Sequence, residues 1–120
     1  MARHHIMEKA VSDPRYSILE QTLSELCEQM QVHGLWANEP PSAGDLQSDK
    51  PFCVDTLSFE KWLQFVMVPT FLTMIQQQIP LPEQCDISPM AQEMWKQEFT
   101  DLQASIKRID ELLTDSKNNQ

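Results

Sequence analysis

Glycine, histidine and cysteine are all scarce in this sequence of 120 residues, and each shortage excludes a kind of site. The two glycines, Gly34 and Gly44, stand alone. Phosphate-binding loops of the G-x-G-x-x-G and Walker A types need repeated glycines, because the backbone must approach the phosphate closely. Of the three histidines only His33 lies inside a patterned segment, so a serine or cysteine nucleophile would lack an activating base. We therefore expect no catalytic residues and no cofactor.

The three cysteines are widely spaced and include no C-x-x-C pair. An odd number of cysteines without a disulfide framework is typical of reduced thiols in the cytosol. Cys27 and His33 would lie on different faces of a helix, and no Cys or His pair has the spacing of a zinc site. The acidic residues lack the order of a calcium loop. We expect no metal site, and we interpret His33 as a favourable partner of a helix C-terminus.

Basic residues are also few, since 9 Lys and Arg face 18 Asp and Glu and leave a formal charge of -9. This charge argues against direct binding of nucleic acid, because a clustered basic face contributes most of that affinity. The acids are unevenly placed: residues 16–57 contain seven acids and a single base, Lys50. Such a segment would attract a basic protein surface. We expect a protein partner rather than nucleic acid.

One long uncharged stretch lies between Lys61 and Glu83, but polar residues and Pro69 interrupt it. A membrane-spanning helix needs about 20 apolar residues, so we expect a core helix here and no contact with a membrane. The first ten residues contain no apolar run of the kind found in a signal peptide. These features favour a cytoplasmic protein.

Periodic apolar residues predict the first helix. It would begin at Asp13 or Ser12 as N-cap, with Pro14 at the first helical position. One stripe follows at helical spacing: Tyr16, Leu19, Leu23, Leu26 and Met30. Gly34 is placed to end the helix in a left-handed conformation, with Leu35 touching Met30 beyond it.

A loop of nearly twenty residues, 37–55, precedes the second helix and is rich in proline. The second helix is expected from about Leu57 to Gln77, and Asp55, Thr56 and Ser58 are three possible N-caps. Its residues are apolar on almost every side, which is typical of a helix in the middle of a fold. Pro69 removes a backbone hydrogen bond to the Phe65 carbonyl, so we expect a kink.

The last helical region follows Ser88 and Pro89, which repeat the pattern of a cap followed by proline. It is either one long helix or a short helix and a longer one, with a break near 97–100. The sequence predicts an all-α fold, a small bundle of three or four helices with a buried, Pro-kinked central helix. The expected organisation is a single domain over 13–114, with flexible tails at 1–12 and 115–120.

The most unusual segment runs from Leu35 to Pro69, where aromatic residues and prolines gather. In one interpretation the loop folds back as a lid on the core; in the other it forms a groove for a partner segment or a small ligand. A buried Gln64 would need hydrogen-bond partners, either a loop carbonyl or a backbone group near Pro69. The candidate binding residues are Trp36, Glu39, Pro40, Phe52, Asp55, Trp62, Gln64 and Pro69.

Several segments resemble the YqcC-like family of small bacterial proteins. They read WANEP at 36–40, PFCVDTL at 51–57, EKWLQFVMVP at 60–69, LP at 81–82 and ISPM at 87–90. The order and spacing fit from about Tyr16 to Leu113, whereas the N-terminal tail is longer and the stretch before the last helix is shorter. The resemblance implies a small helical bundle with no established activity. It also implies an association with tRNA pseudouridine synthase C through gene neighbourhood.

Three hypotheses about function follow from these features. The first is a non-catalytic cytosolic accessory protein that binds another protein, such as a tRNA pseudouridine synthase. The second is a binding module for a small apolar or amide-bearing ligand, held in a groove between the long loop and the central helix near Gln64. The third is an enzyme that uses Asp55 or Cys53, although neither has an accompanying base or metal site.

Overall fold

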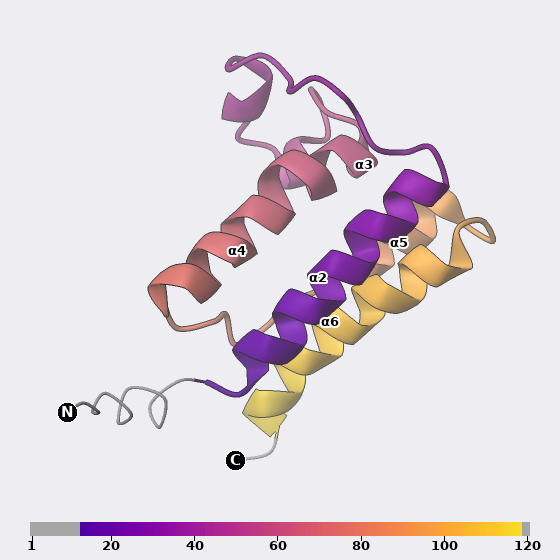
Figure 1. Ribbon diagram of the computed structural model, residues 1–120. Helices are drawn as coiled ribbons and strands as arrows, with labels where there is room; N and C mark the ends of the chain where they lie inside the picture. The colour runs from indigo at the N-terminus through magenta and orange to yellow at the C-terminus, as the bar shows by residue number, and fades with distance from the viewer. Residues whose placement is uncertain (1–12, 119–120) are drawn as a thin grey trace.

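The computed structural model describes residues 13–118, and every regular element among them is helical (Figure 1). The principal elements are α2 (Arg15–Val32), α3 (Phe59–Trp62), the π-helical η3 (Leu63–Met67), α4 (Val68–Gln77), α5 (Ser88–Trp95) and α6 (Thr100–Asn118). Two short 3-10 turns, η1 (Asp45–Gln47) and η2 (Pro51–Cys53), interrupt the long loop. The expected all-α bundle is confirmed. The tail expected at 1–12 lies outside the described residues, and α6 continues past residue 114 to Asn118.

The helices α2 and α6 lie side by side and form the base of the bundle (Figure 1). Each contributes a stripe at the 3-4 spacing of a helix, and the side chains of both stripes are at most 1% exposed. The stripes consist of Leu19, Leu23, Leu26 and Met30 in α2 and of Leu102, Ile106, Ile109 and Leu113 in α6. Burial of one such side chain contributes about 1.5–3 kcal/mol, so these two stripes form the main part of the core.

Both ends of α2 follow local signals in the sequence. The Asp13 carboxylate accepts the Arg15 N–H at 2.9 Å, which is the contact of an N-cap. At the other end Gly34 has a φ of 75°, and the Leu35 N–H bonds to the Met30 carbonyl at 2.8 Å. This is a Schellman motif, which confirms the predicted end of the helix.

The elements α3, η3 and α4 follow one another without interruption, and we call them together the rod. In η3 the Val68 N–H bonds to the Leu63 carbonyl, five residues back, so this turn is wider than an α-helical turn. Pro69 follows at once. A wider turn relieves the clash between a proline ring and the carbonyl four residues earlier, so the irregularity expected from Pro69 appears one turn ahead of it.

The rod buries one side and leaves the other exposed, which differs from the expected burial on almost every side. Phe59, Leu63, Met67 and Phe71 are at most 7% exposed. The opposite side is at the surface: Pro69, Thr70 and Thr73. The rod covers the α2–α6 pair from above in Figure 1, and the eight-residue α5 is too short to enclose it. Among residues 13–118 no further helix covers the outer side.

The last helical region is divided, so the second of the two alternatives for it is confirmed. Helix α5 ends at Trp95 and α6 begins at Thr100. In the connection between these helices Lys96 has a φ of 56° and Phe99 a φ of 54°, and the chain reverses at these positive-φ residues. None of the helices in the described part of the chain is both long enough and apolar enough to cross a membrane.

Candidate interaction surface

The long loop folds back onto the rod and is fastened to it at Gln64. The side-chain oxygen of Gln64 accepts the Ala37 N–H, and its Nε2 donates to the Ala37 carbonyl, both at 2.9 Å. Gln64 is 7% exposed, so these bonds are shielded from water. Of the two partners proposed for Gln64, the structure selects the loop carbonyl. A small ligand that used the Gln64 amide would need this pair to open.

Aromatic side chains make the second contact between the loop and the rod. The Phe52 ring lies edge-to-face on Trp62, with ring centroids 4.8 Å apart, and 6.2 Å from Phe59. Phe52 adopts a φ of 59°, a conformation that costs about 1–2 kcal/mol for a residue with a Cβ. Trp36 is half-buried and also packs against the core. The loop therefore has the arrangement of a lid, whose aromatic packing offsets the backbone strain.

The loop is held in shape by its own polar residues. Asp55 accepts a hydrogen bond from the Ser48 hydroxyl, and the Thr56 hydroxyl donates to the Asp45 carbonyl at 2.7 Å. Of the three candidate caps for the second helix, Ser58 performs this role and accepts the Lys61 N–H at 3.3 Å. Asp55 therefore belongs to the loop rather than to the helix.

The structure divides the eight candidate residues into groups. It brings Trp36 and Gln64 together through the intervening Ala37, and Phe52 together with Trp62. The remaining candidates stand at the surface: Glu39, Pro40, Asp55 and Pro69. Pro69 lies on the exposed side of the rod, and Glu39 and Pro40 lie in the loop before η1. The candidates therefore form a latched lid with exposed residues around it, and not one closed cavity.

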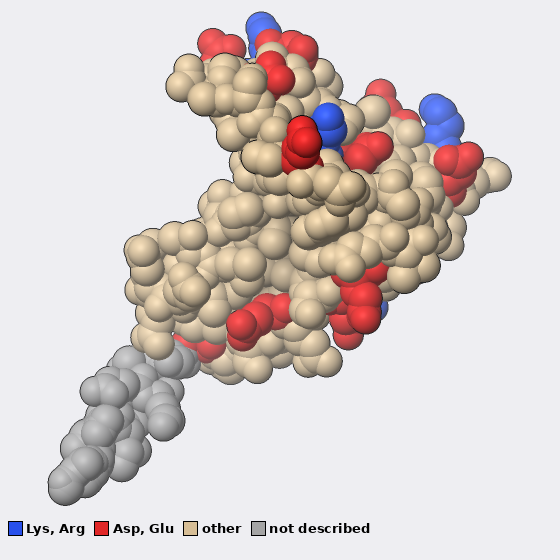
Figure 2. Space-filling model, turned by 45° about the horizontal axis from the view of Figure 1, so that its top comes forward, with Lys and Arg blue, Asp and Glu red and all other residues tan. Residues whose placement is uncertain are grey.

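Charge on this part of the molecule is sparse and mostly negative. Figure 2 shows acidic side chains scattered around the loop and few basic ones, beside a broad uncharged area. Residues 62–82, which include most of the rod, contain no charged side chain. Carboxylates thus surround a neutral surface.

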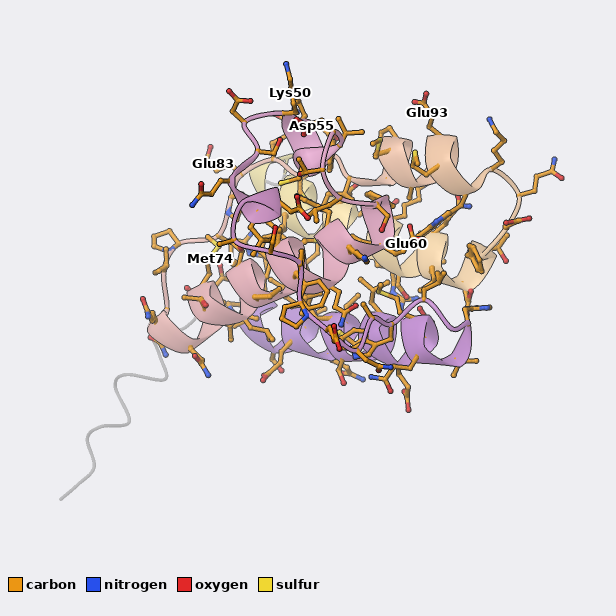
Figure 3. The ribbon with its side chains drawn as sticks, turned by 90° about the horizontal axis from the view of Figure 1, so that it is seen from above. Lys50, Asp55, Glu60, Met74, Glu83 and Glu93 are labelled. Atoms are coloured by element: carbon orange, nitrogen blue, oxygen red, sulfur yellow. The ribbon has the colours of Figure 1, made fainter. Side chains whose placement is uncertain are left out.

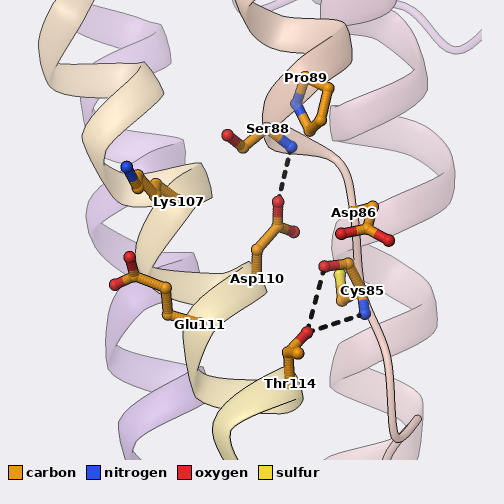
Figure 4. Close-up of a pocket in the computed structure, with 8 residues that line it drawn as sticks. All are labelled: Cys85, Asp86, Ser88, Pro89, Lys107, Asp110, Glu111 and Thr114. Atoms are coloured by element: carbon orange, nitrogen blue, oxygen red, sulfur yellow. Dashed lines mark hydrogen bonds between the residues drawn. The ribbon is translucent and has the colours of Figure 1, made fainter.

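A polar pocket of about 270 Å³ lies on the other side of the α4–α5 linker, against α6 (Figure 4). The buried Asp110 carboxylate accepts the N–H groups of Ile87 and Ser88, at 3.0 and 2.7 Å. It thereby caps the start of α5 from a different helix. Sequence reasoning missed Asp110, because one acid in a helical pattern carries no signal that distinguishes a cap from a solvated residue.

The same pocket contains a cysteine that is poorly suited to nucleophilic chemistry. Burial, together with the neighbouring Asp110, raises the pKa of the Cys85 thiol well above its usual range. The backbone of Cys85 is held by the Thr114 hydroxyl, at 3.3 Å from the Cys85 nitrogen. Within residues 13–118, no three His, Cys, Asp or Glu side chains are grouped so that they could hold a metal ion.

The fold and this surface define a class: a small all-α bundle protein in which a long loop is latched to a rod that contains a π-helical turn. Comparison with known proteins makes the assignment more specific. Residues 18–113 match the family described as "DUF446: tRNA pseudouridine synthase C". The chain belongs to this family, the YqcC-like family, as the segments around the loop and the rod indicate.

Relatives of known sequence or structure agree with the assignment. An uncharacterized protein of Haemophilus influenzae is 39% identical over 84 residues, which cover 70% of this chain and 78% of that protein. The uncharacterized protein YqcC of Escherichia coli K12 is 30% identical over 60 residues, 50% of this chain and 55% of that one. The solution NMR structure of E. coli YqcC superposes with a TM-score of 0.69 at 26% identity, covering 83% of this chain and 88% of that one.

A third relative differs in length. The tRNA pseudouridine synthase C of Pectobacterium carotovorum is 26% identical over 82 residues. The matched segment covers 68% of this chain but only 22% of that protein. This chain therefore resembles a minor part of a much longer protein.

Proposed function

We propose that this chain is a non-catalytic accessory protein of the bacterial cytoplasm that binds a tRNA pseudouridine synthase. The observation that carries the proposal is the match to 22% of a protein named tRNA pseudouridine synthase C. Two modules joined in one chain meet at a high effective concentration, so even a weak contact between them is maintained. Where the small module is a separate chain, the same contact must persist by its own affinity.

The charge of the chain supports contact with the enzyme rather than with its RNA. An enzyme that binds tRNA needs a cationic face to neutralise phosphates. A chain with a formal charge of -9 is repelled by RNA and attracted to such a face. The exposed carboxylates of Glu39, Asp49 and Asp55 in the long loop are placed to take part in this attraction.

The chemistry of the described residues supports a role without catalysis. The raised pKa of the Cys85 thiol keeps it protonated at neutral pH, and a protonated thiol is a weak nucleophile. Cys53 is buried, and Asp55 is engaged with the Ser48 hydroxyl. The Nε2 atom of His33 lies 3.0 Å from the Asp101 carboxylate, so this histidine is already engaged.

Binding to the synthase can be measured directly. The full chain and the pseudouridine synthase C of the same bacterium are purified separately, mixed, and examined by size-exclusion chromatography with light scattering. We expect a complex that weakens as salt screens the charges. A pseudouridine synthase of another family is the matched control and should not bind. If no complex forms even at low salt, the proposal is wrong.

A second measurement addresses catalysis. The chain alone is incubated with unmodified tRNA, and pseudouridine is quantified by mass spectrometry after digestion. We expect none from the chain alone and normal formation with the synthase. Pseudouridine formed by the purified chain without the synthase would contradict the non-catalytic role.

A further inference from the structure

An apolar pocket of about 170 Å³ opens beside Trp62, on the rod and the linker that follows it. Its lining consists of Trp62, Val66, Met67, Thr70, Phe71 and Ile87. A different pocket on the rod, lined by Val68 and Leu72, faces α2. The pocket beside Trp62 therefore belongs to the side of the rod that α2 does not cover.

The lining favours a protein side chain as the occupant. The Thr70 hydroxyl and the Trp62 indole N–H are the only polar groups among the lining side chains, so few groups could orient a polar small molecule. Trp62 forms an aromatic wall of this pocket. At protein interfaces, pockets of this kind bind the apolar side chains that anchor the partner. Val66 and Met67 belong to the π-helical η3, and such turns occur often at functional sites.

Two exposed carboxylates, Glu83 and Asp86, lie on the linker that contributes Ile87 to the pocket. Figure 3 shows Asp55 and Glu83 on the side of the molecule away from α2, together with Lys50. Asp86 directly precedes the lining residue Ile87 and opens onto the polar pocket of Figure 4, where Asp110 and Glu111 outnumber the single base, Lys107. An occupant with an apolar anchor and neighbouring Lys or Arg side chains complements both features.

We infer that the pocket beside Trp62 receives one apolar side chain from a cationic segment of the pseudouridine synthase. This inference rests on the proposed function and adds to it the contact surface and the chemistry of the partner segment. The half-buried Trp62 and the exposed Thr70 make the pocket accessible without a change in the fold. The lid is then a support that holds Phe52 against Trp62, and the pocket is the docking point.

The test compares two variants in which an arginine is introduced at different positions. Thr70→Arg puts a bulky cation into the pocket, and Ser17→Arg puts the same group on exposed α2. Affinity for the synthase is measured by isothermal titration calorimetry, and circular dichroism melting verifies the fold. We expect Thr70→Arg to weaken binding at least tenfold and Ser17→Arg to leave it within twofold.

A second pair of variants tests the charges without altering the pocket wall. Asp86→Lys and the exposed Glu28→Lys on α2 change the net charge equally. We expect Asp86→Lys alone to weaken binding several-fold and to reduce its dependence on salt. This pair decides the question if Thr70→Arg fails to fold.

The outcomes separate the two proposals. If the wild-type chain binds the synthase but both members of each pair bind alike, the pocket assignment is wrong and the proposed function stands. If the wild-type chain does not bind, both are wrong. A homodimer of the chain that Thr70→Arg dissociates, with binding to the synthase unaffected, would assign the pocket to a second copy and overturn the inference.

Discussion

Gln64 and Ala37, which are 27 residues apart, exchange two hydrogen bonds between a side-chain amide and the backbone N–H and C=O of Ala37. The arrangement resembles a hydrogen-bonded residue pair in an antiparallel sheet, but it joins a helix to a loop. Because Gln64 is 7% exposed, water does not replace a bond that is lost. The pair is the latch that keeps the long loop on η3.

Removal of this latch should destabilise the protein. In Gln64→Ala the N–H and carbonyl of Ala37 lose their partners, so we expect the free energy of unfolding to fall by about 2–4 kcal/mol. Urea denaturation measures this change, and amide hydrogen exchange should become faster at Ala37. Exposed Gln76→Ala on the same rod is the control, with an expected change of at most about 0.5 kcal/mol. Equal stability of the two variants would show that the latch contributes nothing.

The cap that α6 provides to α5 should be equally sensitive. Asp110→Ala removes the acceptor of the Ile87 and Ser88 N–H groups, so we expect a loss of about 2–4 kcal/mol in unfolding free energy. Asp110→Asn retains one acceptor oxygen and should lose less. Thermal denaturation compares both with exposed Glu111→Ala. A wild-type melting temperature in Asp110→Ala would contradict the capping role.

The two glycines should respond differently to substitution by alanine. Gly34 has a φ of 75°, and a Cβ in this left-handed conformation costs about 1–2 kcal/mol. Gly44 has a φ of -64°, and a Cβ there would meet only the Ser42 Oγ, at 3.9 Å. We expect Gly34→Ala to lower the unfolding free energy and Gly44→Ala to leave it unchanged or raise it slightly. The opposite order in urea denaturation would contradict the assigned helix end.

The start of α2 should lose stability in acid. Hydrogen bonds from the Arg15 guanidinium lower the pKa of Asp13 below 3.8, although partial burial opposes this effect. A carboxyl whose folded pKa is depressed stabilises the fold above its unfolded pKa, and this stabilisation is lost as pH falls through the folded pKa. Asp13→Asn should therefore be less stable than wild type at pH 7, by about 0.5–1.5 kcal/mol.

The difference between wild type and Asp13→Asn should disappear below the depressed pKa. Urea denaturation from pH 7 to pH 2 measures it, with the exposed Asp49→Asn as control. A difference that does not change with pH would show that the effect of the substitution is not ionic.

Local patterns were enough to predict most of the helices. The stripes of α2 and α6 follow the 3-4 spacing that burial of one helix face requires, and Gly34 marks the end of α2. The buried side of the rod was harder to predict. A helix that is apolar on every side is expected to be buried, but its pattern does not show which side packs against other helices. The π-helical turn was not predicted, since Pro69 signals an irregularity but not its kind or its place.

By itself the sequence determined the helical class, the ends of α2, the uneven charge and the family, because these depend on residues that are neighbours in the chain. Only the tertiary structure decided which groups are joined across 22 or more residues, such as Gln64 with Ala37 and Asp110 with Ser88. The chemistry of a polar side chain shows which hydrogen bonds it can make, but not which group of the protein will lie next to it. The partner of Gln64, the cap of α5 and the open pocket beside Trp62 arise from packing, which places distant segments against one another.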